Sequence, residues 1–339
     1  MTAFTKFLDT ELAPLVRRMA DRPRHPDGAD DETGNRQIRA MVWQGLAEIG
    51  LPTRQQDLVE LAELLGSVLY QGPLLDTVSA GDLLARAGLD GLIRKGEAVA
   101  LAIRAHGAAS PAELAPVVTE HGLLSTRRYF VGFAAEVEHL VVVGDRLALV
   151  PRDHPTVTLR RYEETGRGEL FDVRFTGTPV TAWIGDGEQW RPALATARIR
   201  QAAYLVGLSQ GALDLAVRYA TARRQFGQPI GRFQALAFRL AELGIRIDAA
   251  RLLTRDAARE AERGLDARLV AAQSLATAAE LARTVTTAAM QIHGAAGMTS
   301  GNDAQVFYRR AAIEALWLGS PTQLRAEAAP LLLERVSDR

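Results

Sequence analysis

The chain has 339 residues, of which 47% are hydrophobic and 24% are charged. This composition is typical of a folded protein, and the length favours two or three domains. Lys+Arg and Asp+Glu both number 40, and a chain without a basic excess is a poor candidate for a general nucleic-acid binder. The absence of cysteine excludes disulfides, thiolate metal sites and cysteine nucleophiles.

The start of the chain lacks the long apolar core of a signal peptide. No stretch reaches the roughly 20 apolar residues that a membrane span needs. We therefore expect a cytoplasmic protein that does not associate with membranes.

The N-terminal part of the chain is predicted to be helical. Apolar residues recur there at three- and four-residue spacing, and Gly72-Pro73 interrupts one such stretch. The predicted helical stretches lie at 3–19, 36–49 and 56–88, with a polar loop at 21–35. Residues 1–95 therefore form a predicted helical domain.

The pattern changes near residue 96 to short β-rich runs. The predicted strands lie within 98–105, 139–150, 156–162 and 170–177. The second run contains two strands, because Gly144-Asp145 in its middle is a hairpin signal. Residues 96–185 are therefore a predicted β domain.

The remainder, 186–339, is predicted to be a bundle of long helices. Residues 266–293 contain neither Gly nor Pro and are rich in Ala, and Gly207 and Gly211 put two small residues on one helix face; both features favour close helix packing. The order helices, strands, helices excludes a TIM barrel and a Rossmann fold, which need alternating βα units. The predicted fold class is α+β, mostly α.

The sequence contains none of the short motifs that we searched for: a Walker A loop, GxGxxG after a strand, HExxH or GxSxG. Its six histidines are scattered without metal-ligand spacing. We expect no bound metal.

Residues 221–234 read TARRQFGQPIGRFQ, which predicts a helix end, a turn at Gly227 and Pro229, and a new helix from about Gly231. Arg223 and Arg224 could direct a guanidinium at a phosphate beside the N-terminus of that helix. For an isolated pair, two solvated arginines would be the simpler interpretation.

This segment resembles the R-x-Q-F-G-x-P-I-x-x-F-Q signature of the acyl-CoA dehydrogenase family. QIHGAAG at 291–297 resembles the family's Q-x-x-G-G-x-G block, and FYRRAAIEALWLGSPTQLR at 307–325 resembles the helix and segment that follow it. The blocks occur in the family's order, and the likeness spans about 190–325. The resemblance implies an N-terminal helical domain, a middle β-barrel-like domain and a C-terminal long-helix bundle.

The resemblance also implies FAD as cofactor, extended between protomers, with its ADP half held by the neighbouring protomer. Arg223 would then contact the pyrophosphate and Arg198 would lie near the acyl thioester. The other positions that match cofactor contacts of the family are Phe226, Phe233, Gln234, Gln291, Gly294, Ala295, Gly297, Ser320 and Thr322. Ala295 stands where the family has a glycine.

The catalytic base of the family is absent from both of its usual positions, which are occupied by Leu318 and Ala197. Loss of a positioned base costs on the order of 10²–10⁴-fold in rate. Glu314 lies one helical turn before Leu318 and is a candidate substitute; a surface or salt-bridged glutamate is the alternative.

The middle domain departs from the family as well. We find no flavin-facing glycine–serine–aspartate, and in RRYFVGFA at 127–134 the residues Tyr129 and Val131 stand where the family has tryptophan and threonine beside the flavin. The resemblance therefore predicts that the half of the site that holds the flavin ring is degraded, whereas the ADP-holding half is intact.

These departures favour a base-lacking partner subunit that completes a FAD site in a hetero-oligomer with an acyl-CoA dehydrogenase homologue. The reaction of such a complex would be α,β-desaturation of an acyl-CoA or acyl-carrier thioester in lipid metabolism, with an electron-transfer flavoprotein as a candidate acceptor. Two alternatives stay open: a self-sufficient, homo-oligomeric dehydrogenase with a relocated base, and a repurposed flavin-binding or non-redox enzyme of secondary metabolism.

Overall fold

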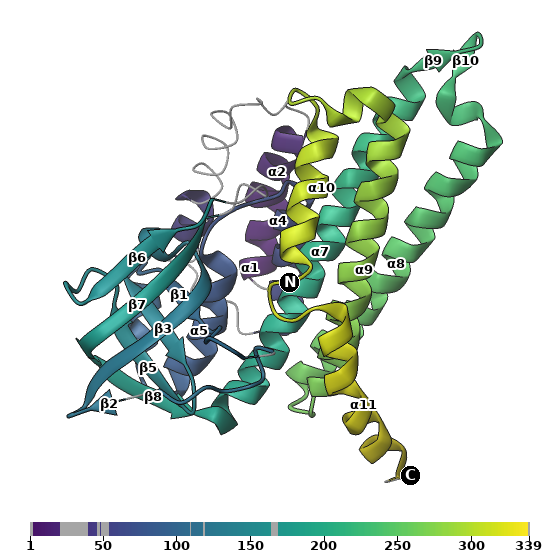
Figure 1. The fold of residues 1–339 in the computed structure, drawn as a ribbon. Helices are drawn as coiled ribbons and strands as arrows, with labels where there is room; N and C mark the ends of the chain where they lie inside the picture. Colours follow the sequence, from purple (N-terminus) through teal and green to yellow (C-terminus); the bar gives the residue numbers. More distant parts are fainter. Residues whose placement is uncertain are drawn as a thin grey trace. The chain divides into compact units, whose positions relative to one another are not determined.

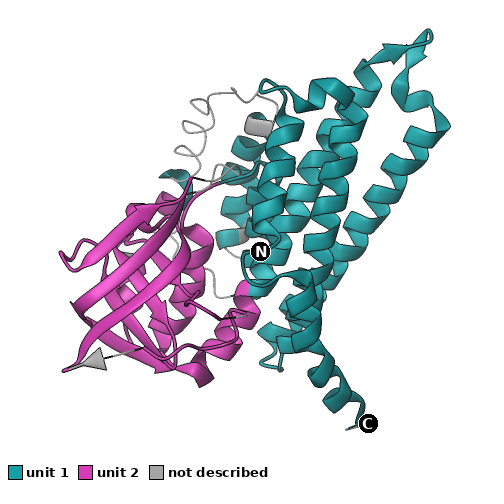
Figure 2. Ribbon diagram, in the orientation of Figure 1, with its two compact units in different colours: residues 1–42, 52–70, 198–339 teal, residues 43–51, 71–197 magenta. Residues whose placement is uncertain are grey.

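The computed structural model describes residues 3–20, 40–45, 48, 54–108, 110–117, 119–163 and 169–337. The chain divides into two compact units (Figure 2): unit 1 comprises residues 1–42, 52–70 and 198–339, and unit 2 comprises residues 43–51 and 71–197. The division into three consecutive domains is a different partition of the chain and stays a prediction.

Apart from the two short strands β9 (Arg224–Gln225) and β10 (Gln228–Pro229), the secondary structure described in unit 1 is helical (Figure 1). Its first helix combines α1 (Ala3–Phe7), a π-helical segment (Leu8–Leu12) and α2 (Ala13–Ala20), which confirms the helix predicted at 3–19. The loop predicted at 21–35 lies outside the described residues, as does half of the stretch at 36–49. The described residues of that stretch, 40–45 and 48, are helical as predicted. The other helices are α4 (Gln55–Ser67), the part of α7 (Gly187–Ala222) from Arg198 onward, α8 (Gln234–Glu262), α9 (Arg268–His293), α10 (Asp303–Glu314) and α11 (Pro321–Ser337).

Glycines bring α4 and α7 into backbone contact. A Cβ atom at Gly207 would overlap the carbonyl oxygen of Glu63, and one at Gly66 would overlap the carbonyl oxygen of Tyr204. Gly211 likewise approaches the backbone of α4. The prediction that the glycines of α7 serve close packing is confirmed.

Unit 2 contains two four-stranded sheets and the helices α5 (Leu74–Arg86) and α6 (Gly91–Arg94). The first sheet has the order β1-β4-β5-β8, with β1 parallel to β4 and the other pairs antiparallel. The second sheet is antiparallel in the order β2-β3-β7-β6. The strands are β1 (Val99–Ala102), β2 (Thr119–Glu120), β3 (Leu123–Gly132), β4 (His139–Val143), β5 (Arg146–Pro151), β6 (Val157–Arg161), β7 (Leu170–Pro179) and β8 (Ala182–Asp186).

The two sheets enclose one apolar core, to which Val142, Ala148 and Val173 contribute fully buried side chains. The hairpin predicted at Gly144-Asp145 is confirmed, because β4 and β5 pair antiparallel on either side of these residues. The predicted barrel-like arrangement takes the form of two packed sheets, which an isolated bridge between Arg104 and Tyr129 joins.

None of the helices that the structure describes is both long enough and apolar enough to cross a membrane.

The glycine contact generates a first prediction. Gly207→Ala should lower the free energy of unfolding by about 1–3 kcal/mol, because the added methyl group forces α7 away from α4. Denaturant unfolding measures this loss. Gly301→Ala is the matched control, since a Cβ atom at Gly301 would meet no atom within 4 Å; equal losses in both variants would contradict the backbone contact.

Candidate functional site

Arg223 lies where α7 ends and a short hairpin begins. Strands β9 (Arg224–Gln225) and β10 (Gln228–Pro229) pair antiparallel. Between them Phe226 and Gly227 have φ angles of 50° and 80°, so both occupy the left-handed region that a type I′ turn requires. The turn exposes 92% of Phe226.

The chain then reaches α8 through a short 3₁₀ helix at Ile230–Arg232, so α8 begins later than the sequence suggested. The ring of Phe233 meets that of Phe226 edge-on, with centroids 6.2 Å apart. Phe233 is also the N-cap of α8 and gives it no side-chain cap. The first amides of α8 therefore lie uncapped beside the arginine hairpin, an arrangement that favours anions.

Three polar side chains in this region have no partner within the described part of the chain. Arg223, Gln234 and Gln291 are exposed, and the hydrogen bonds at Arg223 involve only its backbone, which donates to Tyr219 and accepts from Ile230. Their guanidinium and amide groups are therefore free to bind a ligand.

An aromatic stack links the end of α7 to the end of α9. The rings of Tyr219 and His293 lie 4.3 Å apart and nearly parallel. His293 is buried and its Nδ1 hydrogen-bonds the carbonyl oxygen of Ala289. Burial lowers the pKa of His293 below 6.5, an effect that this hydrogen bond opposes. The stack of His293 on Tyr219 therefore keeps the C-terminal ends of α7 and α9, with Arg223 and Gln291, next to each other.

The turn after α9 depends on two glycines. Gly294 has φ 59° and ψ −139°, a combination that residues with side chains rarely adopt. At Gly297 a Cβ atom would lie 2.9 Å from Cβ of His293. Ala295, which stands at a family glycine, is exposed, so the turn accommodates its methyl group.

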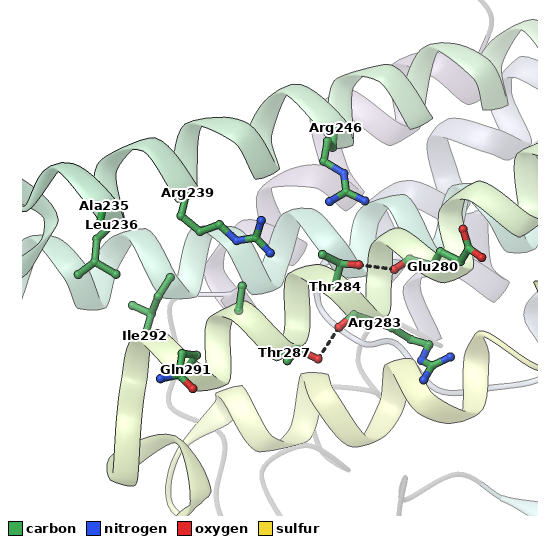
Figure 3. Close-up of a pocket in the computed structure, with 11 residues that line it drawn as sticks. Ala235, Leu236, Arg239, Arg246, Glu280, Arg283, Thr284, Thr287, Gln291 and Ile292 are labelled. Atoms are coloured by element: carbon green, nitrogen blue, oxygen red, sulfur yellow. Dashed lines mark hydrogen bonds between the residues drawn. The ribbon is translucent and has the colours of Figure 1, made fainter.

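A groove of about 810 Å³ lies between α8 and α9 (Figure 3). Gln291 and Leu236 line one end of it, and Arg239, Arg246 and Arg283 line its length. Sequence reasoning missed this groove. The seven-residue spacing of Arg239 and Arg246 was a usable signal, because it places both on one face of a helix.

Ser320 has a structural role that the sequence interpretation did not assign. Its hydroxyl accepts a hydrogen bond from the backbone of Gln323 at 3.3 Å, and its own backbone N–H donates to Oε1 of Gln323 at 2.8 Å. This is a capping box at the start of α11, with Pro321 at the first helical position. Thr322 is exposed. Cofactor contact by Ser320 and Thr322 stays a prediction.

The two positions at which the family carries its base are buried and apolar. Leu318 and Ala197 are each 4% exposed. Nε of Arg198 donates to the carbonyl oxygen of Leu318 at 3.1 Å, and Nη1 donates to Oε2 of Glu327 at 2.7 Å. Arg198 thus joins α7 to α11 with its charge countered, and its role toward a substrate stays a prediction.

Glu314 is held by two buried side chains. One carboxylate oxygen accepts from Nη2 of Arg310 at 2.6 Å, and the other accepts from Nε2 of Gln201 at 2.7 Å. As a base it would have to break an ion pair with a buried arginine, and a carboxylate so engaged is poorly suited to proton abstraction.

The segment at 127–134 runs along β3 in unit 2. Val131 is 1% exposed and belongs to the apolar core. Tyr129 lies beneath the guanidinium of Arg127, whose Cζ is 4.8 Å from the ring centroid. Within the residues that the structure describes, no three His, Asp or Glu side chains gather in a way that could hold a metal ion.

The family model described as acyl-CoA dehydrogenase, C-terminal domain, matches residues 187–329. Probable acyl-CoA dehydrogenase FadE25 of Mycobacterium tuberculosis is 41% identical over 158 residues, which cover 45% of this chain and 40% of that relative. The chain thus matches well under half the length of this curated relative.

Solved structures match the whole chain. The Tcur3481–Tcur3483 steroid ACAD has a TM-score of 0.82 at 24% identity, covering 99% of this chain and 100% of that one. The ChsE4–ChsE5 complex from Mycobacterium tuberculosis has a TM-score of 0.80 at 22% identity, covering 98% of both. Residues 187–329 thus match the C-terminal domain of the acyl-CoA dehydrogenase family, and the chain has the fold of these enzymes, as the three sequence blocks indicated.

The buried imidazole predicts a pH dependence. In the unfolded chain His293 binds a proton at a higher pH than in the folded chain, so the free energy of unfolding should fall as the pH drops below about 6.5. Urea unfolding across this range measures the slope. His293→Phe keeps a ring against Tyr219 and should flatten it, whereas His121→Asn at an exposed position should keep the wild-type slope. A wild-type slope in both variants would rule out His293 as the cause of the pH dependence.

The Glu314 contacts predict a loss of stability. Glu314→Gln should lower the free energy of unfolding by about 3 kcal/mol, because it removes the charge opposite buried Arg310. The exposed Glu334→Gln on α11 is the matched control and should stay within about 0.5 kcal/mol of wild type. An unchanged stability with complete loss of dehydrogenation in the intact assembly would instead make Glu314 the base.

Proposed function

We propose that this chain is the base-lacking subunit of a hetero-oligomeric acyl-CoA dehydrogenase. It supplies the ADP-side contacts of a FAD site to a homologous partner, and the partner carries the base for α,β-desaturation of an acyl thioester. One observation carries the proposal: the anion-binding residues are exposed and free, whereas the positions of the base are apolar or neutralised.

The lack of a base follows from Leu318, Ala197 and Glu314. Removing a proton from the α-carbon of a thioester requires an ionised group within hydrogen-bond reach of that carbon. Leu318 and Ala197 have no titratable group, and both oxygens of Glu314 are engaged. This supports a division of labour in which the proton is removed by another chain.

The residues around the arginine hairpin and the turn after α9 fit the ADP portion of FAD. The guanidinium of Arg223 can donate two hydrogen bonds to a pyrophosphate, and the uncapped start of α8 adds backbone donors. The amides of Gln234 and Gln291 can bind the adenosine part, and Gly294 lets backbone approach it closely. When bound, FAD supplies the hydride acceptor of the family's reaction.

The spacing along α7 supports two separate sites. Arg198, beside Leu318, and Arg223 are 25 residues apart, which corresponds to about 38 Å along a helix axis. One extended FAD molecule is shorter than this. This separation supports a site shared between two chains, in which the ADP-side residues of one chain contact a cofactor other than the one nearest its own Leu318.

One solved neighbour is a complex of ChsE4 with ChsE5. Fold likeness to it supports assembly with a homologue but does not identify the partner. A cytoplasmic location, an acyl-CoA or acyl-carrier thioester as substrate and an electron-transfer flavoprotein as acceptor belong to this proposal. The self-sufficient and repurposed alternatives are distinguished by the following experiment.

The visible absorption spectrum tests the proposal. The chain purified alone should contain little flavin, and the chain co-expressed with a homologue that bears glutamate at the position of Leu318 should contain about one flavin per pair of chains, because the FAD site needs both. One flavin per chain in the isolated protein, bleached by an acyl-CoA, would overturn the proposal in favour of a self-sufficient enzyme. Flavin without bleaching by any acyl thioester would favour the repurposed alternative.

Substitution of Arg223 sharpens the test. In the co-expressed pair, Arg223→Gln should weaken FAD binding by about ten- to a hundredfold, since charge-assisted hydrogen bonds to the pyrophosphate are lost. Arg218→Gln, an exposed change five residues earlier, should leave the affinity unchanged. Equal affinity in both variants would remove Arg223 from the cofactor site.

A further inference from the structure

Helix α8 carries an exposed apolar stripe. Phe238, Ile245 and Leu252 are 64%, 70% and 60% exposed. They are spaced seven residues apart, which is close to two helical turns, so they lie on one face of α8. Three large apolar side chains in a row on the outside of a bundle mark a surface that another helix covers.

The groove between α8 and α9 runs along the edge of this stripe. Arg239 and Arg246 directly follow Phe238 and Ile245, so their face is rotated by about 100° from the stripe. Both arginines line the groove (Figure 3). They share one carboxylate, Glu242, at 3.0 Å from Arg239 and 3.8 Å from Arg246.

The α9 side of the groove adds further positive charge. Glu280 is bound by Arg325 through two hydrogen bonds of 2.6 Å. Arg283 is exposed, and among the described residues no carboxylate lies within 4.0 Å of it. Four arginines thus face two glutamates, which leaves two positive charges in excess beside the apolar stripe.

The hydroxyl groups of the groove do not offset this charge. The hydroxyl of Thr284 donates to the carbonyl oxygen of Glu280 at 2.8 Å, and that of Thr287 donates to the carbonyl oxygen of Arg283 at 2.7 Å (Figure 3). Apart from the amide of Gln291 at its end, the groups of the groove that are free to bind a partner are therefore cationic.

The excess positive charge of the groove opposes pairing of this chain with a second copy of itself. In a two-fold contact a surface meets its own copy, so the arginines of one groove would approach those of the other. Like charges held together at a partly desolvated interface oppose assembly, whereas carboxylates opposite the same arginines favour it.

We propose that the α8–α9 groove selects a different chain with acidic residues, rather than a second copy of this chain, as the occupant of the α8 stripe. This inference rests on the proposed hetero-oligomer and adds the residues that choose its partner. Arg246 and Arg283 are the principal determinants. Arg246 shares Glu242 with Arg239, and Arg283 acts only at longer range on Glu280, which is already bound by Arg325.

A charge-reversed copy of the chain provides the acidic partner for a test. The variant R246E/R283E replaces the excess of two positive charges in the groove by an excess of two negative charges. Wild-type and variant chains, mixed in equal amounts at roughly 50 mM salt, are analysed by native mass spectrometry. Mixed dimers should exceed the half that random pairing gives and should outnumber wild-type dimers by about tenfold or more. At roughly 500 mM salt the mixture should approach random pairing, because the charges are screened.

The variant R86E/R263E changes two exposed arginines that do not line the groove and should pair with wild type at random. Random pairing of R246E/R283E at low salt, or a mixture that stays monomeric, overturns the inference. A groove that binds inorganic pyrophosphate while pairing stays random would be assigned to a small anion instead. The flavin content of the pair with a glutamate-bearing homologue is measured separately, so the charge selection can fail while the shared FAD site stands.

Discussion

The backbone contact between α4 and α7 is the constraint on which the arrangement of unit 1 depends. Gly66, Gly207 and Gly211 have no side chains, so α7 lies against α4 at a distance that no other residue would allow. A helix fixed at its middle presents its two ends at fixed positions. Arg198, about three turns into α7, and Tyr219, near its C-terminal end, therefore meet their partners, Leu318 and His293, without adjustment of the chain.

Buried ion pairs limit the proton-transfer chemistry that is available near Leu318. Arg198 is neutralised by Glu327, and Arg310 by Glu314. Such pairs are costly to break because each partner would be left charged in a poorly solvated place. A general base must exchange protons readily, and these carboxylates are fixed by their arginines. The side chains of this region are engaged in packing and ion pairs, whereas the guanidinium of Arg223 is exposed and free to donate hydrogen bonds.

Local sequence patterns predicted most of the helices and strands. The assignment of these elements to the two units depends on long-range packing, which local patterns do not contain. The hairpin at Gly144-Asp145 and the helix from Arg268 to His293 follow from turn chemistry and composition. No periodicity could indicate that α4 packs in one unit and α5 in the other, because that depends on partners far along the chain.

Within the candidate site, contacts between residues close in sequence could be predicted, whereas contacts between residues far apart in sequence could not. The capping box of Ser320 and Gln323 and the four-residue spacing of Arg310 and Glu314 were readable signals. The contact of Gln201 with Glu314 spans 113 positions of sequence, so local pattern carries no trace of it.

The turn at Phe226 has a consequence for the chain before it meets any partner. A ring that is 92% exposed at the tip of a hairpin, together with the stripe on α8, is apolar surface that water solvates poorly. Chaperones and proteases recognise such surface in newly made proteins. Under the proposed assembly, copies made in excess of the partner are therefore short-lived, and the supply of the partner sets the amount of this chain in the cell.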